Sequence, residues 1–88
     1  MLLIFNSNSC LFALVSYYKD QAFIEGFAKK LKQIRESKGF SQEKLSLITN
    51  ISQSQIARTE LAQVNTSISH LALYAKALGI SPKDLLDF

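Results

Sequence analysis

Residues 41–60 read SQEKLSLITNISQSQIARTE, and this stretch decides the fold. Ser41 and Ser52 are favourable N-caps, and each follows an apolar residue that can pack one turn into the next helix. Asn50 lies between them, and asparagine is the non-glycine residue that best tolerates a left-handed backbone. The pattern predicts two short helices, over residues 42–49 and from residue 53, joined by a turn of about three residues.

Such a pair is the construction of a helix-turn-helix unit, with a plain helical hairpin in a bundle as the alternative that the sequence leaves open. Upstream of it, apolar residues at intervals of three and four predict a helix from Phe23 to near Lys38. Gly39 then supplies the left-handed residue that commonly follows a helix end.

Two more helices are predicted downstream. Ser67 caps the first, which ends at Gly79, and Ile80-Ser81-Pro82 begins the second. The buried stripe of the first is expected to consist of Ile68, Leu71, Ala72, Ala75 and Leu78. The predicted fold class is therefore all-α, a five-helix domain over residues 23–88.

Residues 1–22 form an N-terminal extension in this interpretation, and residues 1–18 carry no charge. Two apolar pieces, 2–5 and 11–18, flank Asn6-Ser7-Asn8-Ser9, a turn-forming run that can close a hairpin of two short β-strands. Such a hairpin needs cover from the helical body or from a second copy of the chain. The alternative is a disordered extension, or a start codon assigned too far upstream.

Composition narrows the function classes. The chain has 88 residues and a formal net charge of +3, which allows one domain. Its one cysteine, Cys10, and one histidine, His70, cannot supply a disulfide or a four-ligand zinc site. The longest apolar run is far below the roughly 20 residues of a membrane span. It has neither the basic residues before it nor the small-residue cleavage site after it that a secretory signal has. We expect a cytoplasmic protein with no metal, no cofactor, no membrane partner and no catalytic motif.

The helix from residue 53 has one polar side that is not needed for packing against the domain. Ile56, Thr59 and Glu60 are expected to face the domain, which leaves Gln53, Ser54 and Arg58 outward with Ala57 and Leu61. Glutamine can pair with adenine, arginine with guanine or phosphate, and serine with several partners. These residue types are also ordinary on any solvent-facing helix, so composition alone does not establish DNA binding.

The order of residues over 31–88 resembles the Cro and phage-repressor type of helix-turn-helix domain, also called the xenobiotic response element family. The matching stretches are LKQIRESKGFSQEKLSLITNISQSQIARTE and SISHLALYAKALGISPKDLL. The resemblance implies a five-helix fold that binds palindromic double-stranded DNA as a two-fold dimer, with the helix from residue 53 in the major groove.

The resemblance also implies residue roles. Gln42 and the backbone amide of Ser52 match phosphate contacts, and Arg35 with Glu60 matches a partly buried ion pair. Gln55 fits either an inward capping box or an outward phosphate contact. The groove-contacting positions are Gln53, Ser54 and Arg58.

Two positions depart from the family pattern. Asn50 and Ala62 stand where the family usually has glycine, and alanine suits a left-handed helix end poorly. The loop over residues 62–66 is therefore expected to be built differently. Positive charge concentrates instead on the helix from Phe23, at Lys29, Lys30, Lys32, Arg35 and Lys38.

Two function classes follow. The first is a homodimeric, sequence-specific transcriptional regulator, either a phage-like repressor or a controller of a restriction-modification system, with dimer contacts at Leu85, Leu86, Phe88 and the N-terminal segment. The alternative is an antitoxin that binds a protein toxin and represses its own operon. Apolar Leu47, Leu61 and Leu73 offer surface for such a partner.

Overall fold

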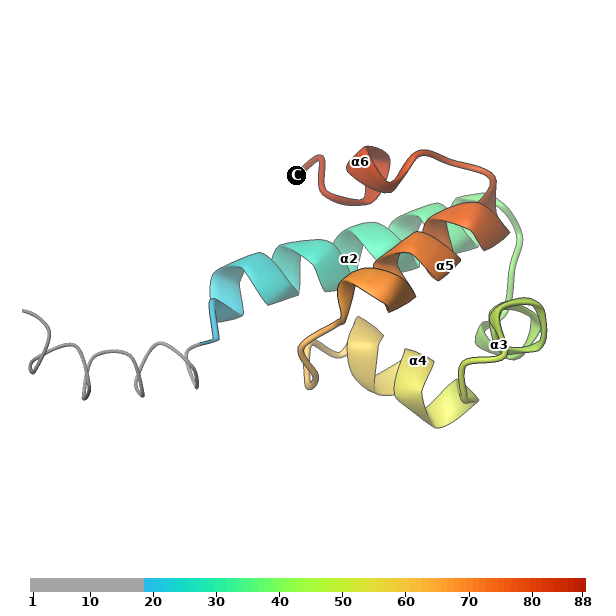
Figure 1. The fold of residues 1–88 in the computed structure, drawn as a ribbon, viewed down its shortest axis with the longest axis horizontal. Coiled ribbons are helices and arrows are strands. Elements are labelled where there is room, and N and C mark those ends of the chain that lie inside the picture. The colour runs from blue at the N-terminus through green and yellow to red at the C-terminus, as the bar shows by residue number, and fades with distance from the viewer. Residues whose placement is uncertain (1–18) are drawn as a thin grey trace, which may run out of the picture.

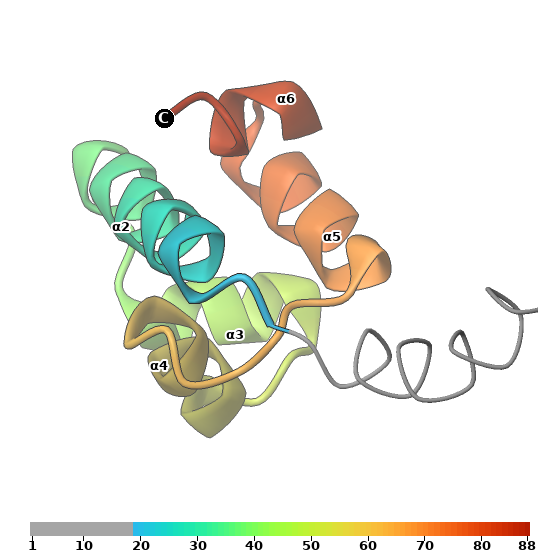
Figure 2. The ribbon, with the colours of Figure 1, turned by 90° about the vertical axis from the view of Figure 1, so that its left-hand side faces the viewer.

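A computed structural model describes residues 19–88, and all of its regular elements there are helices. The helices α2 and α5 lie side by side, α3 and α4 lie beneath them, and α6 covers the opposite side (Figures 1 and 2). The predicted five-helix, all-α fold is confirmed over this range, whereas the predicted N-terminal hairpin lies outside the described residues. The bounds are α2 Gln21–Ser37, α3 Gln42–Thr49, α4 Gln53–Glu60, α5 Ile68–Leu78 and α6 Pro82–Leu85.

Serine caps set where most of the helices begin. The hydroxyls of Ser41, Ser52 and Ser67 each accept the backbone N–H three residues further on, at 3.0 to 3.1 Å. Helix α2 starts two residues earlier than predicted, because the carboxylate of Asp20 accepts the N–H of Phe23 at 3.0 Å.

Left-handed residues set where the helices end. Asn50 has φ 62°, as its place in the sequence predicts, and Gly39 and Gly79 have φ 75° and 70°. Alanine was expected to suit a left-handed helix end poorly, yet Ala62 adopts φ 59° without the conformational freedom of glycine. Two bonds hold it there: Gln63 N–H donates to the carbonyl oxygen of Arg58 at 2.9 Å, and the Gln21 amide donates to that of Ala62 at 3.2 Å.

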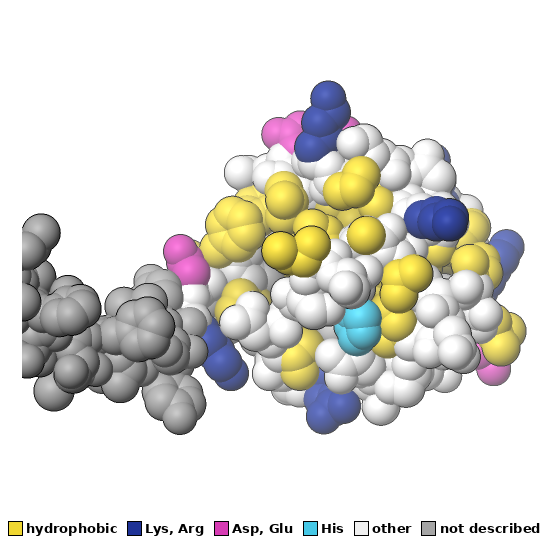
Figure 3. Space-filling model, in the orientation of Figure 1, with side chains coloured by type: hydrophobic (Ala, Val, Ile, Leu, Met, Phe, Trp, Pro, Cys, Tyr) yellow, Lys and Arg dark blue, Asp and Glu magenta, His cyan; other side chains and the backbone are white. Residues whose placement is uncertain are grey.

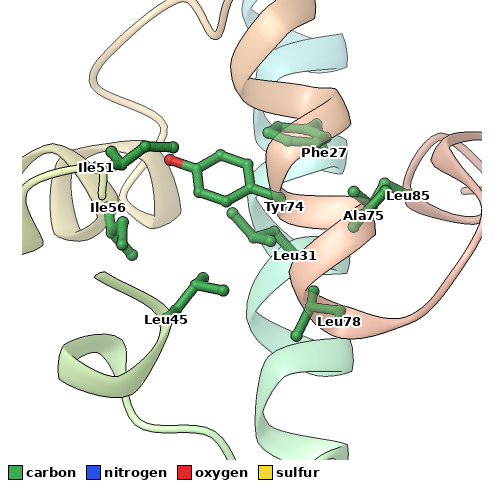
Figure 4. Close-up of a cluster of buried hydrophobic side chains, with 9 residues drawn as sticks. All are labelled: Phe27, Leu31, Leu45, Ile51, Ile56, Tyr74, Ala75, Leu78 and Leu85. Atoms are coloured by element: carbon green, nitrogen blue, oxygen red, sulfur yellow. The ribbon is translucent and has the colours of Figure 1, made fainter. Parts of the chain in front are cut away.

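The core lies between the α2–α5 pair and the α3–α4 pair, and Leu85 of α6 extends it on the opposite side. Figure 4 shows its side chains converging from all five described helices and the α3–α4 turn. Tyr74 sits at its centre with no exposed surface, although the predicted stripe of α5 omitted it. Ile68, placed inside by that prediction, is 84% exposed, and Ala72 is exposed too. The other three predicted residues, Leu71, Ala75 and Leu78, do pack in or against the core, so the prediction was wrong at Ile68 and Ala72 and by the omission of Tyr74.

No helix within residues 19–88 combines the length and the apolar character that crossing a membrane requires.

Candidate nucleic-acid interface

The turn between α3 and α4 is closed by its own hydrogen bonds. Asn50 N–H donates to the carbonyl oxygen of Ser46 at 2.8 Å, and the Ser46 hydroxyl donates to that of Ile51 at 2.6 Å. The Thr49 hydroxyl donates to the carbonyl oxygen of Leu45 at 2.7 Å and accepts the Ile51 N–H at 3.2 Å. Because the polar groups of the turn are paired locally, the angle between the two helices is fixed by the chain itself.

One side of α4 is locked into the domain. Ile56 has no exposed surface and belongs to the core, and Thr59 is 1% exposed. The Thr59 hydroxyl donates to the carbonyl oxygen of Gln55 at 2.7 Å, which satisfies that polar group inside the protein. This side attaches α4 to the domain and does not face solvent.

The other side of α4 is bare. Gln53, Ser54 and Arg58 are exposed, and Leu61, just past the helix end, is 66% exposed. Figure 1 shows α4 along the lower edge of the molecule, with no other described helix beyond it. The predicted outward positions therefore share one free surface, on a helix about 10 Å wide with its side chains, which matches the roughly 12 Å major groove.

Arg58 lies along α4 in loose contacts. Its Nη2 is 3.3 Å from the Gln55 amide oxygen and its Nε is 3.4 Å from the Ser54 carbonyl oxygen, both long for hydrogen bonds to a charged group. The Gln55 side chain turns to Arg58 and not back to the Ser52 N–H, so the capping-box alternative for Gln55 is not the one adopted. Both side chains are available for an outside partner.

A buried charge network ties the far end of α4 to the rest of the domain. Arg35 donates to Glu60 from Nε at 2.6 Å and from Nη2 at 3.0 Å, and its Nη1 donates to the Phe40 carbonyl oxygen at 2.6 Å. The two side chains are only 8% and 3% exposed. The hydrogen bond to Glu60 raises the pKa of Arg35 further above its ordinary value, so the guanidinium stays charged although it is buried.

This network changes the interpretation of two residues. The Gln42 amide donates to Glu60 Oε1 at 2.9 Å, so a phosphate contact by Gln42 would use its remaining N–H. Arg35 is neutralised inside the protein and adds no charge to the surface of α2, contrary to its place in the predicted basic cluster. That surface keeps Lys29, Lys30, Lys32 and Lys38.

The predicted dimer contacts at the C-terminus need one correction. Leu85 has no exposed surface, because it fills the core of its own domain, and it cannot contact a second copy. Leu86 and Phe88 are 40% and 54% exposed. The Phe88 ring lies 5.1 Å from that of Phe23, over Gly26, where a Cβ atom would come within 2.4 Å of the ring.

The sequence assigns His70 no metal-binding or catalytic role, and the structure places it beside the α3–α4 turn. His70 lines a shallow depression of about 440 Å³ together with Asn50, Ser52 and Gln55. Its ring packs edge-on against Tyr74, with centroids 6.3 Å apart. No spacing in the sequence links His70 to the turn, because the contact depends on how α5 packs on α3.

A self-closed turn, an anchored side and an exposed polar side on the second helix define a helix-turn-helix domain. The helix-turn-helix family model matches residues 31–85, and the chain belongs to this family, in the Cro and phage-repressor class of DNA-binding transcriptional regulators. It is a family of DNA-binding regulators rather than of enzymes.

Known relatives narrow the class further. The control protein C.BamHI of Bacillus amyloliquefaciens is 43% identical over 63 residues, which are 70% of this chain and 78% of that protein. The solved restriction-modification controller C.AhdI of Aeromonas hydrophila is 33% identical with a TM-score of 0.71, over 73% of this chain and 97% of that one. The controller C.Esp1396I, solved as a tetramer with its natural 35 base-pair operator, is 27% identical with a TM-score of 0.64, over 74% and 96%.

Proposed function

We propose that this protein is the controller of a restriction-modification system, a transcriptional regulator that binds palindromic operator DNA as a homodimer in the cytoplasm. The observation that carries the proposal is the placement of Gln53, Ser54 and Arg58 on the free side of an otherwise anchored α4. The relatives support it, because two solved structures with this fold are named restriction-modification controllers and one of them holds operator DNA.

The exposed side chains divide into two roles. Gln53 and Arg58 have the bidentate groups that adenine and guanine edges accept in the major groove, and Ser54 suits either kind of partner. Gln42, Gln55 and the backbone amide of Ser52 lie around the start of the two helices, where phosphate contacts position the domain without selecting sequence.

A homodimer would place two copies of α4 in successive major grooves, about 34 Å apart along the duplex. Leu86 and Phe88 are the contacts we propose at the C-terminal end, since both leave apolar surface uncovered by residues 19–88. Removing residues 1–18 tests whether the N-terminal segment contributes: an unchanged dimer in sedimentation would exclude it.

Selection of bound duplexes from a random pool tests the proposal directly. We expect enrichment of one sequence with two-fold symmetry and half-sites one helical turn apart. The variant with Gln53, Ser54 and Arg58 all replaced by alanine should enrich nothing, although it should keep the fold because the three side chains are exposed. Enrichment of the same site by that variant would contradict the assignment of α4.

The antitoxin alternative is not favoured by the relatives, which are named as control proteins. The leucines that motivated it are exposed, with 79%, 66% and 40% of Leu47, Leu61 and Leu73 in contact with solvent. Size-exclusion chromatography after purification from the native host separates the two classes. A homodimer alone agrees with a controller, and a stable complex with a second protein agrees with an antitoxin.

A further inference from the structure

An apolar groove opens beside the first turns of α2. It has a volume of about 220 Å³, and its apolar lining residues come from α2, α5 and the C-terminal end, with Asn65, Thr66 and Ser67 on its rim. In Figure 3 hydrophobic side chains gather on this part of the surface, between the start of α2 and the C-terminus. The apolar lining residues are Phe23, Ile24, Phe27, Ile68, Leu71 and Leu86.

These side chains are unusually open to water. Ile68 is 84% exposed, Phe23 is 49% exposed and Leu86 is 40% exposed. Covering apolar surface stabilises a protein by about 25 cal/mol per Å² removed from water, so a contiguous groove of this kind favours an occupant. The exposed Leu47 of α3 is not among the lining residues of this groove.

The chain itself contains a segment of matching chemistry. Residues 1–18 have no Asp, Glu, Lys or Arg, and both halves are apolar: LLIF at 2–5 and LFALVSYY at 11–18. A segment without charges can enter an apolar groove without the large penalty of desolvating an ion. Asn65, Thr66 and Ser67 on the rim offer polar groups to its backbone.

The point of attachment brings the segment to the groove. It joins the described chain at Lys19, and α2 begins at Gln21 and carries Phe23, a lining residue, in its first turn. At about 3.3 Å per extended residue, a tether of a few residues spans the mouth of the groove. A tethered ligand of this length has an effective concentration in the millimolar range, which a free partner does not reach.

We propose that residues 1–18 bind in this groove of their own domain and cover Phe23 and Ile68. The segment then acts as a built-in cover for an apolar surface that the helical body leaves open. This inference does not depend on which DNA the protein binds. A second copy of the chain in the groove is the competing arrangement, and the experiment separates the two.

Cys10 is the one cysteine in the sequence and lies in the middle of the segment, so it accepts a nitroxide label in the full-length protein. Paramagnetic broadening of methyl resonances then reports which side chains the segment approaches. We expect Ile68, Leu71 and Leu86 to broaden strongly, and Leu47 on α3 to remain sharp. Sharp groove resonances in the labelled chain would overturn the proposal.

A matched pair of variants tests the apolar contact. Ile68→Lys puts a charge into the groove at a position 84% exposed, and Leu47→Lys makes the same change at a position 79% exposed outside it. We expect Ile68→Lys to abolish the broadening of Leu71 and Leu86 and Leu47→Lys to leave it intact. Broadening that survives Ile68→Lys would overturn the proposal.

A mixed sample distinguishes the two occupants. Isotope-labelled chains without nitroxide are mixed with nitroxide-labelled chains of natural isotope content, so that broadening can arise only between chains. We expect weak or no broadening of the groove in this sample. Broadening as strong as in the singly prepared protein would assign the groove to a second copy and overturn binding within one chain.

Discussion

The two sides of α4 differ in their burial and in their hydrogen bonding. Toward the domain, Ile56 and Thr59 are buried and Glu60 is held by two hydrogen bonds from Arg35. Away from it, Gln53 and Arg58 are exposed, and the contacts of Arg58 are long. The comparison teaches that position and recognition are separable in this helix, because the residues that fix where it lies are not those that face outward.

This separation has an experimental consequence. Changes on the anchored side should alter the free energy of unfolding, whereas changes on the free side should alter DNA binding with little effect on stability. The changes below test that division, in descending order of expected effect.

Glu60→Ala should have the largest effect. It removes the acceptor for Arg35 and for the Gln42 amide and leaves a guanidinium buried without its partner. Breaking a buried ion pair in this way costs about 3–5 kcal/mol, a large share of the stability of a small domain. Urea unfolding followed by circular dichroism measures the loss.

Glu36→Ala is the matched control. Glu36 also faces Arg35, at 3.9 Å, but its side chain is 58% exposed. An exposed ion pair contributes about 0–1 kcal/mol, so this variant should unfold near the wild-type midpoint. Equal losses in the two variants would show that burial does not distinguish the two carboxylates.

Arg58→Ala tests the free side. We expect an unchanged unfolding midpoint and a loss of about 1–3 kcal/mol in binding to the selected operator, with relaxed preference at one base pair. Fluorescence anisotropy on the operator and on single-substitution duplexes measures both. Lys83→Ala is the control: it removes the same charge from exposed α6, on the opposite side of the molecule from α4 (Figure 1).

The outcome of Arg58→Ala also assigns the contact. Selective loss on the operator indicates a base contact, and equal weakening on every duplex indicates a phosphate contact. A lowered unfolding midpoint would contradict the division between the two sides of α4.

Sequence reasoning located the features that depend on residues adjacent in the sequence. The serine caps and the left-handed Asn50 follow from local chemistry, and these set the helix bounds and the exposed side of α4. It failed where packing decides. How far the core extends around and along α5 depends on tertiary packing, so Tyr74 was missed and Ile68 misplaced. Leu85 was assigned to a surface it does not reach.

Ala62 shows the same limit at a helix end. Its φ of 59° is unfavourable for alanine, yet the bonds from Gln63 and from Gln21, on a distant helix, hold it. Ala62→Gly should relieve this strain and raise stability by about 1 kcal/mol. Ala57→Gly, inside α4, should lower it by about 0.5–1 kcal/mol. Thermal unfolding of both measures the opposite signs, and a destabilised Ala62→Gly would show that no strain is stored there.

Tyr74 should give the smallest effect at neutral pH and a clear one in alkali. Its hydroxyl is buried beside Thr59, whose own hydroxyl donates to the Gln55 carbonyl oxygen, and it makes no hydrogen bond of good geometry within residues 19–88. Tyr74→Phe should therefore be nearly neutral or slightly stabilising. Burial raises the pKa of the Tyr74 phenol above its ordinary value.

The sign of the pH dependence follows from that shift. Below an ordinary tyrosine pKa of about 10, the phenol is protonated in the folded and the unfolded chain and adds no pH dependence. As the pH rises past that value, the unfolded chain releases the proton while the folded chain retains it, so stability falls with pH. Tyr74→Phe should therefore unfold at higher urea than wild type above pH 10 and near wild type at pH 7. A constant difference across that range would mean that the phenol ionises as easily in the folded core as in water.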